Sequence, residues 1–240
     1  MSAPLVRRSP AHVGEVVDAT QLTPRMRRVT IRSDALVGVE PRPAQDLELL
    51  LREPSGRRVK RRYTIRQHRP ESGEADLDFA LHGDGPGAAW GLAAAAGDRF
   101  EFQGPRGKLS IRPAAWHLLC GDESALPAIA AIAESLPPGE PAIAVVEVAD
   151  ASDELPVRAD VRWVHRGTTP PGTPDPLVSA VSSLDLPTGD GAAYLMGETR
   201  TMVAVRALLE DRGVAHDSIF LKGYWNIGRP DRISGRTPQA

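Results

Sequence analysis

The chain of 240 residues contains a single cysteine, Cys120, so it cannot form an intramolecular disulfide. One thiol also cannot supply a cysteine-rich zinc site or an iron–sulfur cluster. No run of about 20 apolar residues is present that could span a bilayer, and residues 1–10 lack the apolar segment of a signal peptide. These absences predict a cytoplasmic protein that has no membrane partner.

Several catalytic signatures are missing as well. The chain has no G-x-S-x-G elbow, which leaves hydrolase chemistry without a nucleophile, and no G-x-G-x-x-G dinucleotide fingerprint. The six histidines, at positions 12, 68, 82, 117, 165 and 216, show no metal-ligand spacing. The sequence therefore predicts no metal site, and only His82 lies in a turn that indicates a further role.

Charge is balanced over the whole chain but not along it. The formal net charge is −2, yet seven Lys or Arg residues and His68 lie between Arg57 and Arg69. Such a stretch is typical of a solvated basic strand, of a nucleic-acid surface or of a site for an anionic ligand. The apolar content of 41% is ordinary for a globular protein. A length of 240 residues allows one large domain or two small ones.

The pattern of apolar residues changes near residue 113. In the first half, as in residues 47–51 and 77–81, apolar residues recur at every second position, which predicts short antiparallel strands of a barrel or a sandwich. In the second half, strands alternate with helices and end in a strand at residues 219–221, which predicts a parallel sheet with helices on its faces. We therefore expect domains at residues 1–113 and 114–240.

The basic stretch contains Lys60-Arg61-Arg62-Tyr63-Thr64-Ile65-Arg66 on a predicted strand. A flavin dinucleotide needs cations for its diphosphate, an aromatic face for its ring and a hydroxyl or backbone donor near the ring edge, and this segment offers all three. Alternation places Arg61 and Tyr63 on one face, and Thr64 and Arg66 on the other. A bound dinucleotide must then lie across a strand end or take contacts from the backbone. A nucleic-acid patch in which Tyr63 stacks on a base is the alternative.

A second segment, Leu81-His82-Gly83-Asp84-Gly85-Pro86-Gly87-Ala88-Ala89-Trp90, is a strand end that turns into a helix expected to reach Ala96. Pro86 suits the first turn of a helix, and the glycines let the backbone approach an anion closely. Free N–H groups at the helix start favour phosphate. A tight turn followed by a closely packed helix is the simpler interpretation.

In the second half, Gly121-Asp122-Glu123-Ser124-Ala125-Leu126-Pro127 joins a strand to a helix. Ligands of open α/β sheets bind at the carboxyl ends of strands, so this loop and Gly197-Glu198 form the expected docking rim. Two carboxylates make the loop a poor phosphate cradle, and Ser124 is expected to cap its helix. After the last predicted strand come Lys222-Gly223-Tyr224-Trp225-Asn226-Ile227-Gly228-Arg229, whose two rings are most simply explained by core packing.

In combination, these segments resemble the siderophore-interacting protein family, FAD-dependent ferric-siderophore reductases related to the ferredoxin-reductase superfamily. The matching segments, in chain order, are Leu22-Thr23-Pro24-Arg25-Met26-Arg27-Arg28-Val29, Arg61-Arg62-Tyr63-Thr64-Ile65-Arg66, His82-Gly83, Gly85-Pro86-Gly87-Ala88-Ala89-Trp90, Gly104-Pro105-Arg106-Gly107, Asp122-Glu123-Ser124-Ala125-Leu126-Pro127, Gly197-Glu198 and Gly223-Tyr224-Trp225. The resemblance implies a six-stranded antiparallel β-barrel that carries FAD, followed by a parallel, nucleotide-binding-like α/β domain.

The resemblance also implies the site residues. Those expected to contact FAD are Arg61, Tyr63, Thr64, Ile65, Arg66, His82, Gly83, Gly85, Pro86, Gly87, Ala88, Ala89 and Trp90. Those expected to meet the electron donor are Asp122, Glu123, Ser124, Gly197, Glu198, Tyr224 and Trp225. Two departures matter. Ala88 and Ala89 stand where the family often has Ser or Thr, so FAD affinity rests more on arginine. Asn226 and Ile227 stand where it often has arginines, which leaves NADPH, NADH and reduced ferredoxin open as donors.

The expected activity follows from these assignments. Electrons from NAD(P)H or ferredoxin pass through FAD to the Fe(III) of a ferric siderophore, whose hard oxygen ligands hold Fe(III) far better than Fe(II). Arg58, Lys60 and Lys222 are expected to attract an anionic chelate. A ferredoxin, flavodoxin or free-flavin reductase of the same superfamily and a non-enzymatic ferric-chelate carrier are alternatives. A nucleic-acid partner is not expected.

Overall fold

The computed structural model describes residues 10–53, 55–81, 85–107 and 109–228. Its first half is a closed antiparallel barrel with the strand order β1-β2-β5-β4-β3-β6. The strands are β1 His12–Thr23, β2 Met26–Arg32, β3 Asp46–Arg52, β4 Arg58–Arg69, β5 Glu74–Ala80 and β6 Arg99–Arg106. Of the two architectures that the period-two pattern left open, the barrel is therefore confirmed, with the six strands that the resemblance implied.

The interior of the barrel is filled by the alternating apolar residues. Val29, Ile31, Leu49, Leu77 and Phe102 are fully buried in one cluster. Because successive side chains of a strand point to opposite faces, the alternating apolar residues share the face that fills the interior, and most residues between them face outward.

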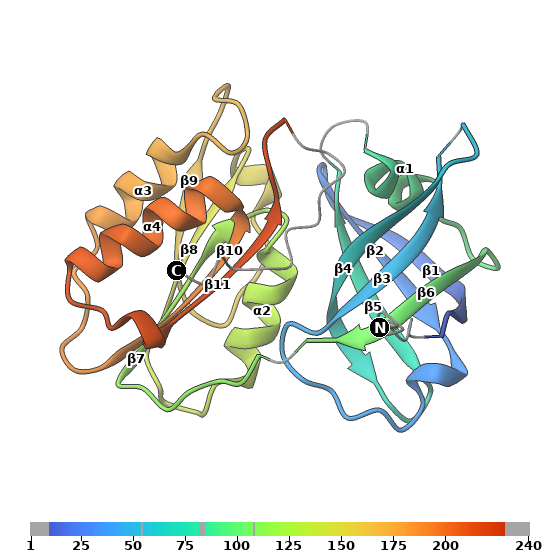
Figure 1. Ribbon diagram of the computed structural model, residues 1–240, viewed down its shortest axis with the longest axis horizontal. Helices are drawn as coiled ribbons and strands as arrows, with labels where there is room; N and C mark the ends of the chain where they lie inside the picture. The colour runs from blue at the N-terminus through green and yellow to red at the C-terminus, as the bar shows by residue number, and fades with distance from the viewer. Residues whose placement is uncertain (1–9, 54, 82–84, 108, 229–240) are drawn as a thin grey trace, which may run out of the picture.

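A short helix covers one end of the barrel. Helix α1, Pro86–Ala93, lies beside the ends of β3 and β4 in Figure 1. A β-carbon on Gly91 would lie 2.5 Å from the ring of Phe79, so the glycine lets the helix pack directly on that ring. The helix ends at Ala93 rather than at the expected Ala96, because Ala94 adopts a non-helical backbone conformation.

The second half is a five-stranded, wholly parallel sheet with the order β11-β10-β7-β8-β9. Its strands are β7 Trp116–Asp122, β8 Ala142–Val148, β9 Asp160–His165, β10 Gly191–Glu198 and β11 Ile219–Trp225. The helices are α2 Leu126–Ser135, α3 Pro174–Ser182 and α4 Thr199–Asp211, and the short 3-10 turns are η1 Asp34–Leu36, η2 Ala151–Asp153 and η3 His216–Ser218. The predicted fold class is confirmed.

The prediction of the last strand was wrong in its extent. It was expected to end at Leu221, but β11 continues to Trp225, so Lys222, Tyr224 and Trp225 belong to the strand itself. Gly223 and Lys222 weakened the apolar signal that would have shown this. The extension matters because it carries these side chains to the carboxyl end of the sheet, where they reach the barrel.

Helix α2 lies between the two halves (Figure 1), whereas α3 and α4 cover the opposite face of the sheet. Ile129 and Ile132 of α2 share one buried cluster with Met26 and Ala44 of the barrel half. The predicted division between residues 113 and 114 falls in the segment between β6 and β7, and it stays a prediction. Among the described residues, no helix combines the length and the apolar character needed to cross a bilayer.

Candidate functional site

The aromatic ring of Tyr63 and the start of α1 meet at one end of the barrel. The Tyr63 ring packs on Phe79, with ring centroids 4.0 Å apart. A β-carbon built on Gly87 would collide with the Tyr63 hydroxyl oxygen, so only glycine permits this approach. Burial raises the pKa of Tyr63 well above its ordinary value. The hydroxyl therefore stays protonated and can donate a hydrogen bond.

The helix start itself is open on its outer side. Gly85 is exposed and receives no side-chain cap, and among the described residues other than its chain neighbours no atom lies within 4 Å of the place where a β-carbon would stand. Pro86 occupies the first turn, as predicted. Trp90 turns inward and packs against Phe100, with centroids 5.1 Å apart. Ala88 is partly buried and Ala89 exposed, whereas His82 and Gly83 lie outside the described residues.

Neighbouring residues of β4 point to different sides, as alternation predicted. Tyr63 faces α1, whereas Thr64 faces the second half and its hydroxyl lies 3.2 Å from that of Tyr224. Arg61 lies two residues before Tyr63, is partly exposed, and donates to the Lys60 carbonyl at 2.9 Å. Arg66 is held elsewhere.

Arg66 and Ile65 do not join the group at α1. The Arg66 guanidinium makes two hydrogen bonds, of 2.8 and 2.5 Å, to the carboxylate of Glu134 on α2. Ile65 is 6% exposed and belongs to the barrel core. The structure thus brings Tyr63 and Gly87 together, keeps Arg61 close enough for its charge to act on Tyr63, and places Arg66 against the second half.

A polar seam, formed by Asp46, Arg62, Thr64, Lys222 and Tyr224, joins β3 and β4 to β11. Asp46 is 2% exposed and accepts from Arg62 Nε at 2.9 Å and from Lys222 Nζ at 2.7 Å. The Lys222 ammonium also lies 5.2 Å from the centroid of the Tyr224 ring. Sequence reasoning missed Asp46, because only the pairing of the two halves shows what it contacts.

At the carboxyl edge of the sheet, both carboxylate oxygens of Asp122 accept hydrogen bonds from other groups of the protein. One oxygen accepts from the backbone and hydroxyl of Ser124, and the other accepts from Glu198 N and Trp225 Nε1, both at 2.9 Å. Gly197 has a φ of 143°, and a β-carbon there would lie 2.6 Å from the Asp122 carboxylate. The Ser124 prediction was wrong: Ala125 is the N-cap of α2, and the Ser124 hydroxyl binds Asp122 instead.

The remaining carboxylates at this edge are also committed. Glu123 and Arg166 form two hydrogen bonds of 2.7 Å, and both are at most 9% exposed. Glu198 is 1% exposed and caps α4 by accepting from Thr201 N at 2.9 Å. Burial, reinforced by the charge of Asp122, raises the pKa of Glu147 to about 7. Within the described ranges, the carboxylates of this edge bond to neighbouring protein groups and do not form a cradle for phosphate.

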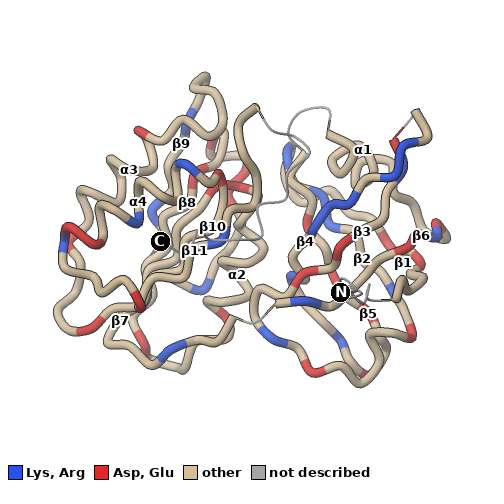
Figure 2. Tube along the Cα trace, viewed as in Figure 1, with Lys and Arg blue, Asp and Glu red and all other residues tan. Residues whose placement is uncertain are grey.

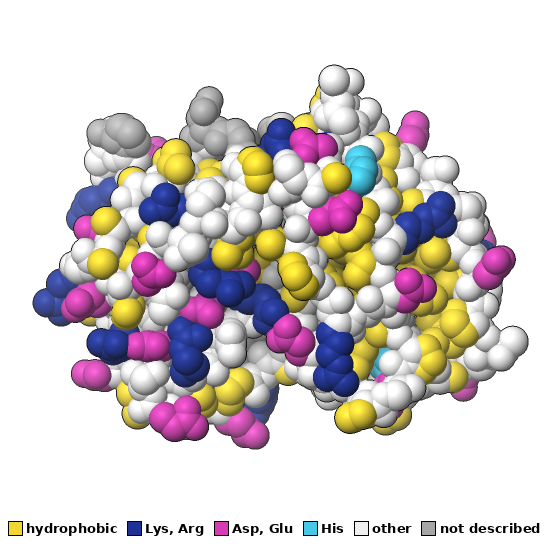
Figure 3. All heavy atoms as spheres, turned by 180° about the vertical axis from the view of Figure 1, so that it is seen from behind, with side chains coloured by type: hydrophobic (Ala, Val, Ile, Leu, Met, Phe, Trp, Pro, Cys, Tyr) yellow, Lys and Arg dark blue, Asp and Glu magenta, His cyan; other side chains and the backbone are white. Residues whose placement is uncertain are grey.

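The basic stretch of β4 is lined with carboxylates. Its ion pairs are Arg57 with Glu53, Arg58 with Glu101, Lys60 with Glu48, Arg62 with Asp46, Arg66 with Glu134, and Arg69 with Glu74 and Asp76. Figure 2 shows basic and acidic residues adjoining along β3, β4 and β6, and Figure 3 shows the same mixing on the back face. A continuous phosphate-binding surface, as nucleic acid requires, is therefore disfavoured.

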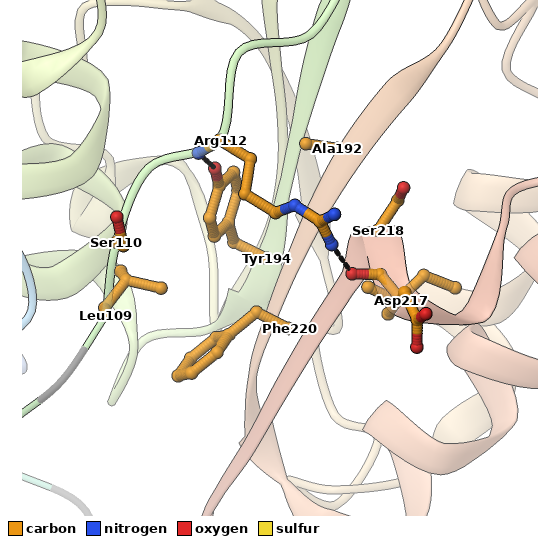
Figure 4. Close-up of a pocket in the computed structure, with 9 residues that line it drawn as sticks. Leu109, Ser110, Arg112, Ala192, Tyr194, Asp217, Ser218 and Phe220 are labelled. Atoms are coloured by element: carbon orange, nitrogen blue, oxygen red, sulfur yellow. Dashed lines mark hydrogen bonds between the residues drawn. The ribbon is translucent and has the colours of Figure 1, made fainter.

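A cavity of about 180 Å³ lies at the opposite end of the sheet from Asp122. The rings of Tyr194 and Phe220 form its wall, and Arg112 donates to the carbonyl of Asp217 beside it (Figure 4). Tyr194 Oη also accepts from Arg112 N at 3.2 Å. None of the predicted site residues that the structure describes lines this cavity.

Comparison with known proteins gives a consistent result. Residues 51–109 match the siderophore-interacting FAD-binding domain, and residues 114–228 match the siderophore-interacting protein family. Ferric vibriobactin reductase ViuB of Vibrio cholerae is 35% identical over 199 residues, which cover 76% of this chain and 72% of that protein.

Solved structures agree with the sequence comparison. A siderophore utilization protein from T. fusca superimposes with a TM-score of 0.84 at 32% identity, covering 91% of this chain and 94% of the other. The siderophore-interacting protein SipS from Aeromonas hydrophila gives a TM-score of 0.78 at 29% identity, covering 92% and 93%.

Proposed function

The chain belongs to the siderophore-interacting protein family, and from that membership we propose that it uses FAD to reduce ferric siderophores and release ferrous iron. The observation that carries the proposal is the contact between Tyr63 and Gly87, which brings an aromatic ring to an open helix start. Arg61 lies on the same strand face as Tyr63. An aromatic face, a cation and free helical N–H groups are what FAD requires, so these residues fit the cofactor.

Within this proposal, the residues near α1 divide the work of holding FAD. The turn at Gly85, Pro86 and Gly87 binds the diphosphate of FAD together with Arg61. Tyr63 contacts the flavin ring or the ribityl group that links the ring to the diphosphate. Thr64 lies on the side of the seam, near the expected position of the flavin edge. Arg66 could reach the diphosphate only by leaving Glu134, so Arg61 is proposed as the principal cation.

Bound FAD supplies a group that takes up two electrons and returns them singly. The overall reaction balances when one NAD(P)H and two ferric chelates give NAD(P)⁺, one proton and two ferrous ions. Because hard oxygen ligands hold Fe(II) weakly, reduction releases the iron while the chelator stays intact. The protein has to position and orient the groups, and no side chain has to act as a general acid or base.

The proposed contacts to an anionic chelate are Arg58, Lys60 and Lys222. Each already faces a carboxylate: Glu101 for Arg58, Glu48 for Lys60 and Asp46 for Lys222. Lys60 is the more open of the two lysines, with 53% of its side chain exposed against 25% for Lys222. Its contribution to chelate binding should therefore be modest and sensitive to salt.

The electron donor is proposed to approach the carboxyl edge of the sheet. Asp122, Glu123 and Glu198 are buried there, so Ser124, Tyr224 and Trp225, which are partly exposed, would meet the donor directly. The committed carboxylates leave no obvious phosphate cradle, and this favours a test of reduced ferredoxin alongside NADPH and NADH.

An absorption spectrum of the purified protein, recorded with and without added FAD, tests the proposal. We expect flavin bands that bleach under anaerobic conditions with one of the three donors and return on addition of a ferric siderophore. Protein that binds a ferric siderophore but no FAD would instead indicate a carrier. Turnover with ferredoxin or free flavin that exceeds turnover with ferric siderophores would indicate another reductase of the superfamily.

A further inference from the structure

Two contacts of the seam, called rungs below, join the barrel to β11. One is between charged groups and the other is between hydroxyls. Asp46 and Thr64 are directly paired residues of β3 and β4, so their side chains lie on one face of the barrel wall. Lys222 and Tyr224 are two residues apart on β11 and also share a face. The first rung joins Asp46 to Lys222 at 2.7 Å, and the second joins the hydroxyls of Thr64 and Tyr224 at 3.2 Å.

The first rung is the stronger and the less adjustable. The Asp46 side chain is 3% exposed and contacts Arg62 with one oxygen and Lys222 with the other. Hydrogen bonds between charged groups are shorter and stronger than those between hydroxyls. A buried carboxylate that loses a cation is penalised by desolvation, so Asp46 holds Lys222 firmly. The Thr64–Tyr224 contact lies beside it on the same pair of faces.

We propose that Asp46 is a positioning residue that fixes β11 against β3 and β4, and thereby places Tyr224 relative to Thr64 at the edge of the FAD site. This inference rests on the proposed function for the meaning of that edge, but the bridge between Asp46 and Lys222 does not. Asp46 itself touches neither donor nor chelate and acts through Lys222.

A double-mutant cycle on the protein without FAD tests the bridge. We expect Asp46→Asn and Lys222→Met each to raise the unfolding equilibrium constant in urea. The unfolding constant of the double variant should equal that of the less stable single variant within about 2-fold. Independent effects that multiply in the double variant would overturn the bridge. If one variant fails to fold, Asp46→Asn is compared in the Lys222→Gln background.

Titration with FAD, followed by flavin fluorescence, tests the positioning. We expect Asp46→Asn to weaken FAD binding about 10-fold, since small displacements of positioned groups have large effects. Asp46→Glu keeps the charge but lengthens the side chain, and it should weaken binding nearly as much. If Asp46→Glu bound FAD like the wild type, charge alone would suffice and the positioning role would be wrong.

Asp78→Asn is the matched control. The Asp78 side chain is also 3% exposed and bonds Arg28 at 2.7 and 2.8 Å, but it joins β5 to β2, the strand pair next to β4 and β3 in the barrel order. We expect it to lower stability without changing FAD affinity. Equal losses of affinity in Asp46→Asn and Asp78→Asn would reduce Asp46 to a structural role. Wild-type protein that binds no FAD would count against the proposed function, while the cycle without FAD would still decide the bridge.

Discussion

Helices α1 and α2 each follow a strand after a short connection and have a proline in their first turn, yet their surroundings differ. The start of α1 is open: Gly85 is exposed and has no neighbour where a β-carbon would stand. The start of α2 is closed, because a β-carbon on Gly121 would collide with the carbonyl of Met196 and Leu126 is 2% exposed. Similar local sequence thus gives one start that could receive a phosphate and another that is part of the core.

The carboxylates sharpen this contrast. Next to α2, Asp122 accepts four hydrogen bonds from its own half, and Glu123 is paired with Arg166. A diphosphate placed there would meet buried negative charge, which is costly in a region of low dielectric. This contrast supports the proposed position of the dinucleotide at α1, and four experiments can break or refine that proposal.

The largest effect is expected at the closed start. Arg166→Met leaves Glu123 and Glu147 without their buried cation, which should cost about 3–5 kcal/mol of unfolding free energy in urea. Arg158→Met is the control, since Arg158 is exposed and should change stability by less than about 0.5 kcal/mol. A nearly neutral Arg166→Met would mean that this edge is open to solvent after all.

The pH dependence of stability comes next. Glu147 is 3% exposed and its pKa rises from 4.5 to about 7 on folding, so the folded protein holds the proton more tightly than the unfolded chain. Its contribution is complete below pH 4.5 and is lost as the pH rises to about 7, a total of about 3 kcal/mol. Glu147→Gln should flatten this slope in urea unfolding between pH 5 and 8, whereas the exposed Glu71→Gln should not.

The open start is tested by adding one methyl group. Gly87→Ala places a β-carbon against the Tyr63 hydroxyl, so either the ring or the helix must move, at about 1–3 kcal/mol. We expect at least a 10-fold loss of FAD affinity in a fluorescence titration. Gly85→Ala finds free space and should leave the melting temperature nearly unchanged. Wild-type FAD affinity in Gly87→Ala would remove the Tyr63–Gly87 contact from the proposed site.

The smallest effect is expected on the barrel surface. Lys60→Glu should weaken binding of an anionic ferric chelate a few-fold at low salt, and less at high salt, because exposed charges are screened. Arg32→Glu is a close match, since Arg32 is 56% exposed against 53% for Lys60 and pairs with Glu74, which lies opposite Arg69 at the far end of β4. Equal effects of both variants would indicate general electrostatic attraction rather than a site.

The sequence showed much of this arrangement, for reasons that are local. Alternation along β4 correctly separated Tyr63 from Thr64. The glycines at the start of α1 predicted a close approach to an anion, which stays a prediction; the approach seen in the structure is between Gly87 and the Tyr63 hydroxyl. It could not show that Arg66 faces Glu134, or that Asp46 faces Lys222, because those partners lie 68 and 176 residues away along the chain. Long-range pairing of charged side chains has no periodicity that a single sequence displays.

The loop after β7 shows the same limit more clearly. Its position at the carboxyl end of a strand predicted a ligand-binding edge by topology, and this stays a prediction, whereas the Asp122 side chain faces inward. The sequence Gly121-Asp122 is the same whether the carboxylate faces solvent or accepts from a backbone N–H. The positive φ of Gly197, which brings β10 against Asp122, shows that this carboxylate is enclosed by the protein.

Helix α2 has a consequence for the order in which the chain can fold. It covers the apolar patch formed by Leu22, Met26, Ala44 and Ala80 on the barrel half. During synthesis the barrel strands are complete at Arg106, whereas α2 ends at Ser135. Until α2 has left the ribosome, this apolar patch of the nascent barrel stays exposed. A chaperone would therefore find an apolar binding surface on the chain during that interval.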